Sequence, residues 1–197
     1  MRTEYSSTQL DALREIANIG SGSASTALSG VLGRPVDISV PNALALPLAD
    51  AVDAAGPADA EVTAVVIPIG GDLDGLVLML FGIEDAQRLC ELLGVDAGTE
   101  IGLSALSEIG NILGTSYVNS LAAMTGLELE PAPPQTVTDM LAAVVATVLS
   151  ASAGEEDLAL LLDSNMHVEG EACSLTFMFV PGPAGVDEVL GRLGLAE

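Results

Sequence analysis

Two glutamate–asparagine pairs are the side chains of this sequence best suited to chemistry on a bound target. They are Glu15 with Asn18 and Glu108 with Asn111. An asparagine amide is not a nucleophile, but it can hold a water molecule, because its oxygen accepts hydrogen bonds and its NH₂ group donates them. A carboxamide orients the attacking water in some phosphoryl-transfer enzymes. The glutamate could be a general base or an anchor for a cation on the target, and we favour the anchor because nothing beside it in the sequence suggests a base.

Each pair belongs to a longer pattern, [Asp/Ser]-x3-Glu-x2-Asn-x22-Pro, whose two copies start 93 residues apart with identical gaps. The residues are Asp11, Glu15, Asn18 and Pro41 in the first copy, and Ser104, Glu108, Asn111 and Pro134 in the second. One such pattern has a chance of roughly one in 10⁵ per starting position at average residue usage. Its recurrence therefore indicates a duplicated functional element. The alternative is that these are ordinary solvated helix residues, since duplication alone also preserves residues.

Both pairs lie on predicted helices, residues 8–32 and 102–125, which end at Gly33 and Gly126. At about 100° per residue, with Asp11 at 0°, Glu15 lies near ~40° and Asn18 near ~−20°. The polar residues thus share one stripe, and Cβ atoms three residues apart are only about 5–6 Å from each other. The residues expected to face the core are Leu13, Ile16, Ala24, Ala27 and Val31 in the first helix, and Leu106, Ile109, Leu113 and Tyr117 in the second.

The remaining elements are predicted in the same order in both halves. The first half has a strand at Val36–Val40 that ends at Pro41, a helix at Ala45–Ala55, a hairpin of Ala60–Ile69 and Leu73–Phe81, and a helix at Ile83–Leu93. The second has a strand at Leu127–Glu130, a helix at Thr138–Ser152, strands at Asp157–Leu162 and Ala172–Val180, and a helix at Val186–Leu193. Because proline stops a strand ladder, Pro41 and Pro134 are expected to shape loops beside the helices.

This order predicts an α+β fold with a pseudo-twofold internal duplication. We expect a single domain, residues 1–197, made of two repeats at about 1–95 and 99–197 that share a β-rich centre.

The chain has a net charge of −23, and all five of its basic residues are arginines. Such acidity argues against nucleic acid and anionic membranes as partners. The acidity suits either solubility, as in a saline cytoplasm, or attraction of a basic partner.

Residues 1–10 lack the apolar core of a signal peptide, and the apolar run Met140–Val148 is too short to span a bilayer, so a cytoplasmic location is expected. Cys90 and Cys173 are predicted to be buried free thiols.

Other possible sites are weaker. The run Gly20–Ser23 lacks the lysine and the preceding strand of a phosphate loop. His167 is the only histidine, and the sequence has no Cys/His cluster for zinc and no histidine-based triad. Asp72 and Asp74 are explained by turn formation.

The doubled motif resembles the CheC branch of the CheC/CheX/FliY family, whose members dephosphorylate the chemotaxis regulator CheY. The resemblance covers essentially the whole chain, and two intact motifs argue against a one-site homologue such as CheX. It implies that Asn18 and Asn111 orient water for in-line attack on the regulator's aspartyl phosphate. It also implies that Glu15 and Glu108 pair with the regulator's active-site lysine, with Asp11, Pro41, Ser104 and Pro134 in support.

By the same resemblance, Mg²⁺ is expected in the regulator and this chain is expected to bind no cofactor. The expected partners are a phosphorylated CheY-like regulator and CheD, a receptor-modifying deamidase, and we expect a monomer. The hypothesis is therefore an aspartyl-phosphate phosphatase. The alternative is a non-catalytic binding module or adaptor for CheD or for phosphorylated CheY.

Overall fold

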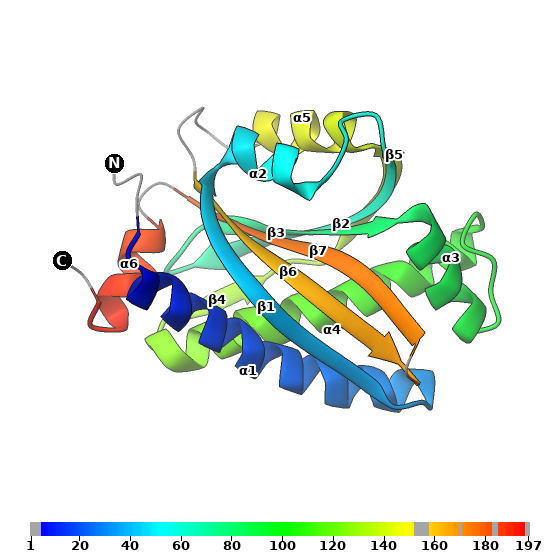
Figure 1. Cartoon of the computed structure of the whole chain (residues 1–197), viewed down its shortest axis with the longest axis horizontal. Helices are drawn as coiled ribbons and strands as arrows, with labels where there is room; N and C mark the ends of the chain where they lie inside the picture. The colour runs from blue at the N-terminus through cyan, green and yellow to red at the C-terminus, as the bar shows by residue number, and fades with distance from the viewer. Residues whose placement is uncertain (1–4, 152–157, 170, 183–184, 196–197) are drawn as a thin grey trace.

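The computed structural model describes residues 5–151, 158–169, 171–182 and 185–195, apart from the side chains of a few residues that include Pro41. The chain forms three layers (Figure 1), with a sheet between the helix pair α1 and α4 on one face and the pair α2 and α5 on the other. Helices α3 and α6 lie at opposite ends of the molecule. The helices are α1 (Ser7–Leu32), α2 (Leu48–Ala55), α3 (Ile83–Leu92), α4 (Glu100–Thr125), α5 (Leu141–Ala151) and α6 (Gly185–Arg192).

The described strands pair antiparallel in one seven-stranded sheet, in the order β1-β6-β7-β3-β2-β4, with β5 also on β2. They are β1 (Val36–Pro47), β2 (Glu61–Gly71), β3 (Gly75–Gly82), β4 (Leu129–Pro131), β5 (Gln135–Met140), β6 (Leu158–Val168) and β7 (Glu171–Pro181). By their order in the two halves, β2 corresponds to β6, β3 corresponds to β7, and β1 corresponds to β4 with β5. If each strand is exchanged for its counterpart, the strand order reads the same from the opposite edge of the sheet. This is the order that an internal twofold would give, and the halves meet at β3 and β7.

The two motif helices begin and end where local sequence signals place them. Ser6 and Gln9 form a capping box at the start of α1, and the Thr99 hydroxyl accepts the N–H of Gly102 at the start of α4. Gly33 and Gly126 follow the two helices with φ of 64° and 70°, the left-handed conformation that glycine adopts without steric cost. Both predicted helices are thereby confirmed.

The sheet separates two apolar clusters. The larger lies beneath α1 and α4, and the smaller lies beneath α2 and α5. The four residues predicted to face inward from α4 are all buried, and so are Leu13, Ile16 and Ala24 of α1.

The prediction was wrong for Ala27 and Val31, which are exposed, while Leu28 and Leu32 are buried instead. The buried stripe of α1 rotates toward the side that carries Ser25 and Ser29, because that side of the helix lies against β1.

Two boundary predictions failed where non-local pairing extends a strand. β1 does not end at Pro41 but continues to Pro47, with a register shift between Ser39 and Asn42 in its pairing with β6. Proline is compatible with an edge strand at such an irregularity, because no ladder N–H is needed there. Residues 45–47 therefore belong to β1, and the helix that follows starts at Leu48.

The helix predicted at Thr138–Ser152 begins only at Leu141, because residues 135–140 pair with β2 as β5. Ser152, at its predicted end, and Asp157, at the predicted start of β6, lie outside the described residues.

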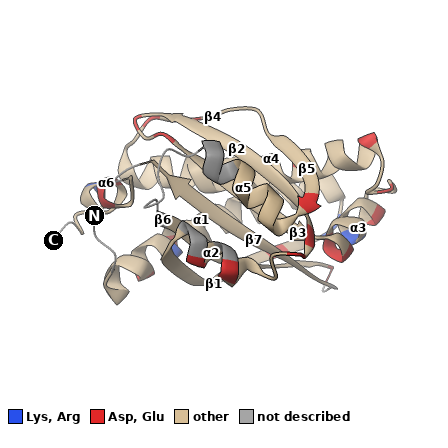
Figure 2. Ribbon diagram, turned by 90° about the horizontal axis from the view of Figure 1, so that it is seen from above, with Lys and Arg blue, Asp and Glu red and all other residues tan. Residues whose placement is uncertain are grey.

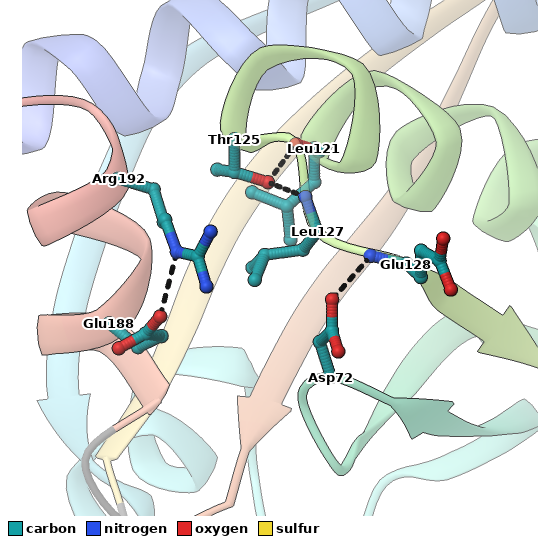
Figure 3. Close-up of polar contacts among 7 residues, drawn as sticks. All are labelled: Asp72, Leu121, Thr125, Leu127, Glu128, Glu188 and Arg192. Carbon is teal, nitrogen blue, oxygen red and sulfur yellow. Dashed lines mark hydrogen bonds and ion pairs between the residues drawn. The ribbon is translucent and has the colours of Figure 1, made fainter.

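The end of α4 is tied to the β2–β3 turn (Figure 3). The Asp72 carboxylate accepts the Glu128 N–H at 2.9 Å, and the Asp72 N–H donates to the Glu128 carbonyl at 2.8 Å. One turn earlier, the Thr125 hydroxyl donates to the Leu121 carbonyl at 2.7 Å. Asp72, which was predicted only to form a turn, thus also contacts a residue distant in the sequence, and it helps to fix the position of α4 along the sheet.

Glycines allow α1 and α4 to pack closely, and the colours of Figure 1 show the two helices running in opposite directions. A Cβ on Gly20 would lie 2.9 Å from the Tyr117 Cα, so the helix backbones meet at that point. In α4, a Cβ on Gly110 would lie within 2.9 Å of Val65 side-chain atoms. Asn111 therefore directly follows Gly110, which allows α4 to pack closely against the sheet.

We expect Gly20→Ala to destabilise the protein by about 1–3 kcal/mol, because the added methyl group collides with backbone. Gly22→Ala is the matched control, since its Cβ would meet nothing within 4 Å. That change should stabilise the helix by about 0.5–1 kcal/mol. Urea unfolding of both variants measures the difference, and equal effects of the two changes would contradict this packing.

Both cysteines are buried and unpaired, as predicted. Burial raises the pKa of the Cys173 thiol to about 12, with a further contribution from the nearby Asp85 carboxylate. Burial also raises the pKa of Cys90. A raised pKa keeps a thiol protonated and unreactive at neutral pH.

Iodoacetamide at pH 8 should therefore modify the native protein at least about 100-fold more slowly than the urea-unfolded chain, whose thiols ionise near pH ~8.5. Mass spectrometry over time measures both rates, and rapid labelling of Cys173 in the native protein would contradict the assigned burial.

Candidate functional site

The first motif copy lies along one side of α1, and we call Asp11, Glu15, Asn18 and Pro41 the α1 site. Asp11 and Glu15 are exposed and Asn18 is half-buried. The Asp11 carboxylate lies 3.0 Å from the Arg14 guanidinium, a solvent-exposed ion pair that contributes little to stability. Within the described ranges Glu15 makes no ion pair and no side-chain hydrogen bond, so its carboxylate is available to a partner.

The Asn18 amide is turned toward the backbone of β1. Its Oδ1 accepts the Val40 N–H at 3.0 Å, and its Nδ2 donates to the Val40 carbonyl at 3.4 Å, which is a longer and weaker contact. Val40 immediately precedes Pro41. The 22-residue gap of the motif therefore spans the turn from α1 back to the point on β1 that Asn18 contacts.

Two serines of α1 contact β1 in the same way. The Ser25 hydroxyl accepts the Ile38 N–H at 3.0 Å, and the Ser29 hydroxyl accepts the Val36 N–H at 2.9 Å. With Asn18, they satisfy alternate N–H groups on the free edge of β1, and we call the three side chains the edge clamp. An uncovered strand edge is a template for unwanted pairing, so the edge clamp both anchors α1 and protects β1.

The second copy lies on α4, and we call Ser104, Glu108, Asn111 and Pro134 the α4 site. Ser104 and Glu108 are exposed and Asn111 is half-buried, the same order as on α1. Pro134 is half-buried in the connection between β4 and β5. Among the residues that the structure describes, neither Glu108 nor Asn111 uses its side chain in a hydrogen bond or ion pair. The structure therefore presents both groups to an incoming partner.

Neither site lies in either of the two best-formed hollows of the described residues. These are an apolar cavity of about 40 Å³ beneath α1 and α4, and a polar hollow of about 360 Å³ on the opposite face of the sheet. Neither hollow includes a Glu or Asn of the motifs.

Among the described residues, no group of three or more His, Cys, Asp or Glu residues is placed to hold a metal ion, and no helix is both long and apolar enough to cross a membrane.

A family model described as the CheC-like family matches residues 9–44 and 101–138, and each matched segment contains one complete copy of the motif. The CheY-P phosphatase CheC of Bacillus subtilis is 34% identical over 166 residues, which are 80% of this chain and 79% of that protein. The chain belongs to the CheC-like family. This confirms the membership predicted from the doubled motif.

Two other similarities bear on the family's fold. The flagellar motor switch phosphatase FliY of Bacillus subtilis is 29% identical over 139 residues, which are 67% of this chain but 36% of that longer protein. The crystal structure of Thermotoga maritima FliY superimposes with a TM-score of 0.77 at 22% identity, and the match covers 98% of this chain and 99% of that one. At that identity the likeness shows the fold alone, and it agrees with the predicted α+β class.

Sequence reasoning put Glu15, Asn18, Glu108 and Asn111 on the outer sides of their helices. The structure confirms this for the two glutamates, which are exposed, whereas both asparagines are half-buried and the Asn18 amide is turned toward β1. It missed the edge clamp. A signal was present, because Asn18, Ser25 and Ser29 recur at the seven- and four-residue spacings of one helix stripe. Their common target could not be identified without knowing that β1 is an edge strand.

We expect Ser25→Ala to destabilise the protein by about 0.5–1.5 kcal/mol, because the Ile38 N–H loses its acceptor. Ser23→Ala is the control on the same helix, since the Ser23 hydroxyl is exposed and donates only to the Ile19 carbonyl of α1 itself. Its effect should stay within about 0.5 kcal/mol. Chemical denaturation of the two variants, with hydrogen exchange at Ile38, measures the difference. Unchanged protection of the Ile38 amide in Ser25→Ala would show that the clamp is not formed.

Proposed function

We propose that this protein is a chemotaxis phosphatase that hydrolyses the aspartyl phosphate of a CheY-like response regulator. The observation that carries the proposal is an exposed glutamate followed three residues later by a half-buried asparagine on each motif helix. Membership of the CheC-like family supports it, because the Bacillus subtilis relative is named a CheY-P phosphatase.

In the proposed mechanism the motif helix docks over the regulator's active site. The glutamate pairs with a cation of the regulator, which fixes the orientation of the complex. The asparagine amide then holds one water molecule in line with the phosphorus–oxygen bond. Water forms the new bond to phosphorus, the aspartate leaves as a carboxylate, and no covalent intermediate forms on this protein.

The contribution of the amide is positioning. Loss of one preorganised hydrogen-bonding group in an active site reduces the rate by about 10²–10³, or about 3–4 kcal/mol of transition-state stabilisation. The divalent cation that this chemistry uses is proposed to reside in the regulator, so the phosphatase supplies only its glutamate and asparagine.

Net charge does not steer this encounter. The chain carries −23, and Figure 2 shows acidic residues on α2, α3 and α6 with few basic residues among them. A regulator's phosphorylated site is also negative, so the approach is repulsive at long range. Association must depend on the local glutamate–cation pair, and moderate salt should assist it by screening the wider repulsion over about 8–10 Å.

The proposal includes three further points from the family resemblance. CheD is the expected second protein partner, the phosphatase acts in the cytoplasm with the regulator, and it acts as a monomer.

The double variant Asn18→Ala/Asn111→Ala should reduce decay of the phosphorylated regulator to the rate seen without phosphatase, because no amide is left to orient water. Loss of phosphate from the radiolabelled regulator measures the rate, and thermal melting confirms that the variant is folded at the assay temperature. Wild-type activity in the folded double variant would refute the mechanism.

The same assay separates an enzyme from a binding module. With the phosphatase at one-twentieth of the regulator concentration, we expect many turnovers for each phosphatase molecule. An adaptor or phosphate sink would instead stop after one or two equivalents, and that result would favour the alternative function.

A further inference from the structure

The two sites share a glutamate, an asparagine and a proline at the same spacing but differ in the residue that lies 22 positions after each asparagine. At the α1 site this residue is Val40, whose N–H and carbonyl hold both polar atoms of the Asn18 amide. At the α4 site it is Pro133, which has no N–H to donate. Across the described ranges, no protein group bonds the Asn111 amide.

We propose that the two sites have diverged in role. The α4 site carries most of the hydrolysis, and Asn18 serves mainly as the third member of the edge clamp. The inference rests on the proposed function and deepens it. It assigns most of the hydrolysis to one of two sites that the motif sequence does not distinguish.

The geometry of Asn18 is the first support. To hold water for a docked regulator, the amide would have to turn outward from β1 and break its bonds to Val40. A protein hydrogen bond of ordinary net strength disfavours such a turn roughly fivefold, and the second, longer contact adds to that. Asn111 faces no such competition and can adopt the outward orientation directly.

The rest of the edge clamp is the second support. Ser25 and Ser29 accept hydrogen bonds from N–H groups of the same strand, so the Asn18 bond to Val40 is one of three similar bonds that hold α1 to β1. The corresponding positions of α4, 93 residues later, are Val118 and Ala122, which cannot form such bonds. The clamp is therefore a property of α1 only.

The outer surface of α4 is the third support. Ile101 is 68% exposed, the highest value among the large hydrophobic side chains described. It precedes Glu108 by two helical turns and therefore lies on the same side of α4. The equivalent residue of α1 is Thr8. An apolar contact in line with the glutamate–asparagine pair gives the α4 site a docking residue that has no apolar counterpart at the equivalent position of α1.

The first test compares single variants in multiple-turnover dephosphorylation and in thermal unfolding, with the assay run well below the melting temperature of each. Asn111→Ala should reduce kcat at least 100-fold and leave the melting temperature near that of the wild type. Asn18→Ala should lower the melting temperature and reduce kcat less than fivefold. Equal losses of activity would overturn the inference while leaving the phosphatase function intact. Wild-type activity in the folded double variant would refute the asparagine mechanism, and no hydrolysis by the wild-type protein would refute the function itself.

Aspartate substitutions give a second and independent readout. Asn18→Asp keeps an acceptor for the Val40 N–H, so it should restore most of the stability that alanine loses. Asn111→Asp keeps the shape but lacks the amide donor and places a negative charge beside the phosphoryl group, so it should remain as inactive as Asn111→Ala. Loss of activity in Asn18→Asp with a native melting temperature would show that Asn18 acts in catalysis, and would overturn the assignment.

The docking residue is tested by exchanging the two equivalent side chains. Ile101→Thr should raise KM for the phosphorylated regulator about tenfold with little change in kcat, because it removes a contact far from the reacting atoms. Thr8→Ile should leave both parameters within twofold. A larger effect of Thr8→Ile than of Ile101→Thr would place regulator docking on α1 and overturn the inference.

Discussion

The position of the α1 site depends on three hydrogen bonds between one helix and one strand. Asn18, Ser25 and Ser29 bind successive outward N–H groups of β1, which forms one edge of the described sheet. These bonds satisfy backbone groups that no ladder partner reaches, and they hold α1 against the sheet edge along much of its length. They also fix the rotation of α1, which is why Leu28 and Leu32 are buried in place of Ala27 and Val31.

A second constraint acts on α4, and it is steric. Gly110 and Gly114 bring the helix so close to β2 that a methyl group at either position would meet Val65 or Ile67. Asn111 therefore projects from a helix held by close packing, while Asn18 projects from a helix held partly by Asn18 itself. Two copies of one motif are thus supported by different forces. This difference allows one copy to be altered in function without loss of the fold.

The parts of the structure that local signals control could be predicted from the sequence. Both motif helices, their glycine ends, the β2–β3 hairpin and the outward placement of Glu15 and Glu108 follow from periodicity and capping residues. The family was also accessible, because the four motif residues recur at fixed spacing. The extension of β1 beyond Pro41 and the pairing of β5 with β2 were not predictable, because each depends on a strand distant in the sequence. The bond from Val40 to Asn18 was missed for the same reason, and the motif spacing does not reveal it, because the α4 site has the same spacing without such a bond.

Neither of the two best-formed hollows in the described residues contains a glutamate or asparagine of the motifs, and this limits how such a protein can catalyse a reaction. A convex helix cannot exclude water or surround a phosphoryl group, so the low-dielectric environment that strengthens catalytic hydrogen bonds must come from the partner. Specificity then resides in the fit between helix and regulator more than in a substrate cavity. For a chain with a charge of −23, general attraction cannot supply that fit. A few local contacts must do so, and an exposed isoleucine in line with a glutamate and an unengaged amide provides one apolar and two polar contacts on a single side of α4.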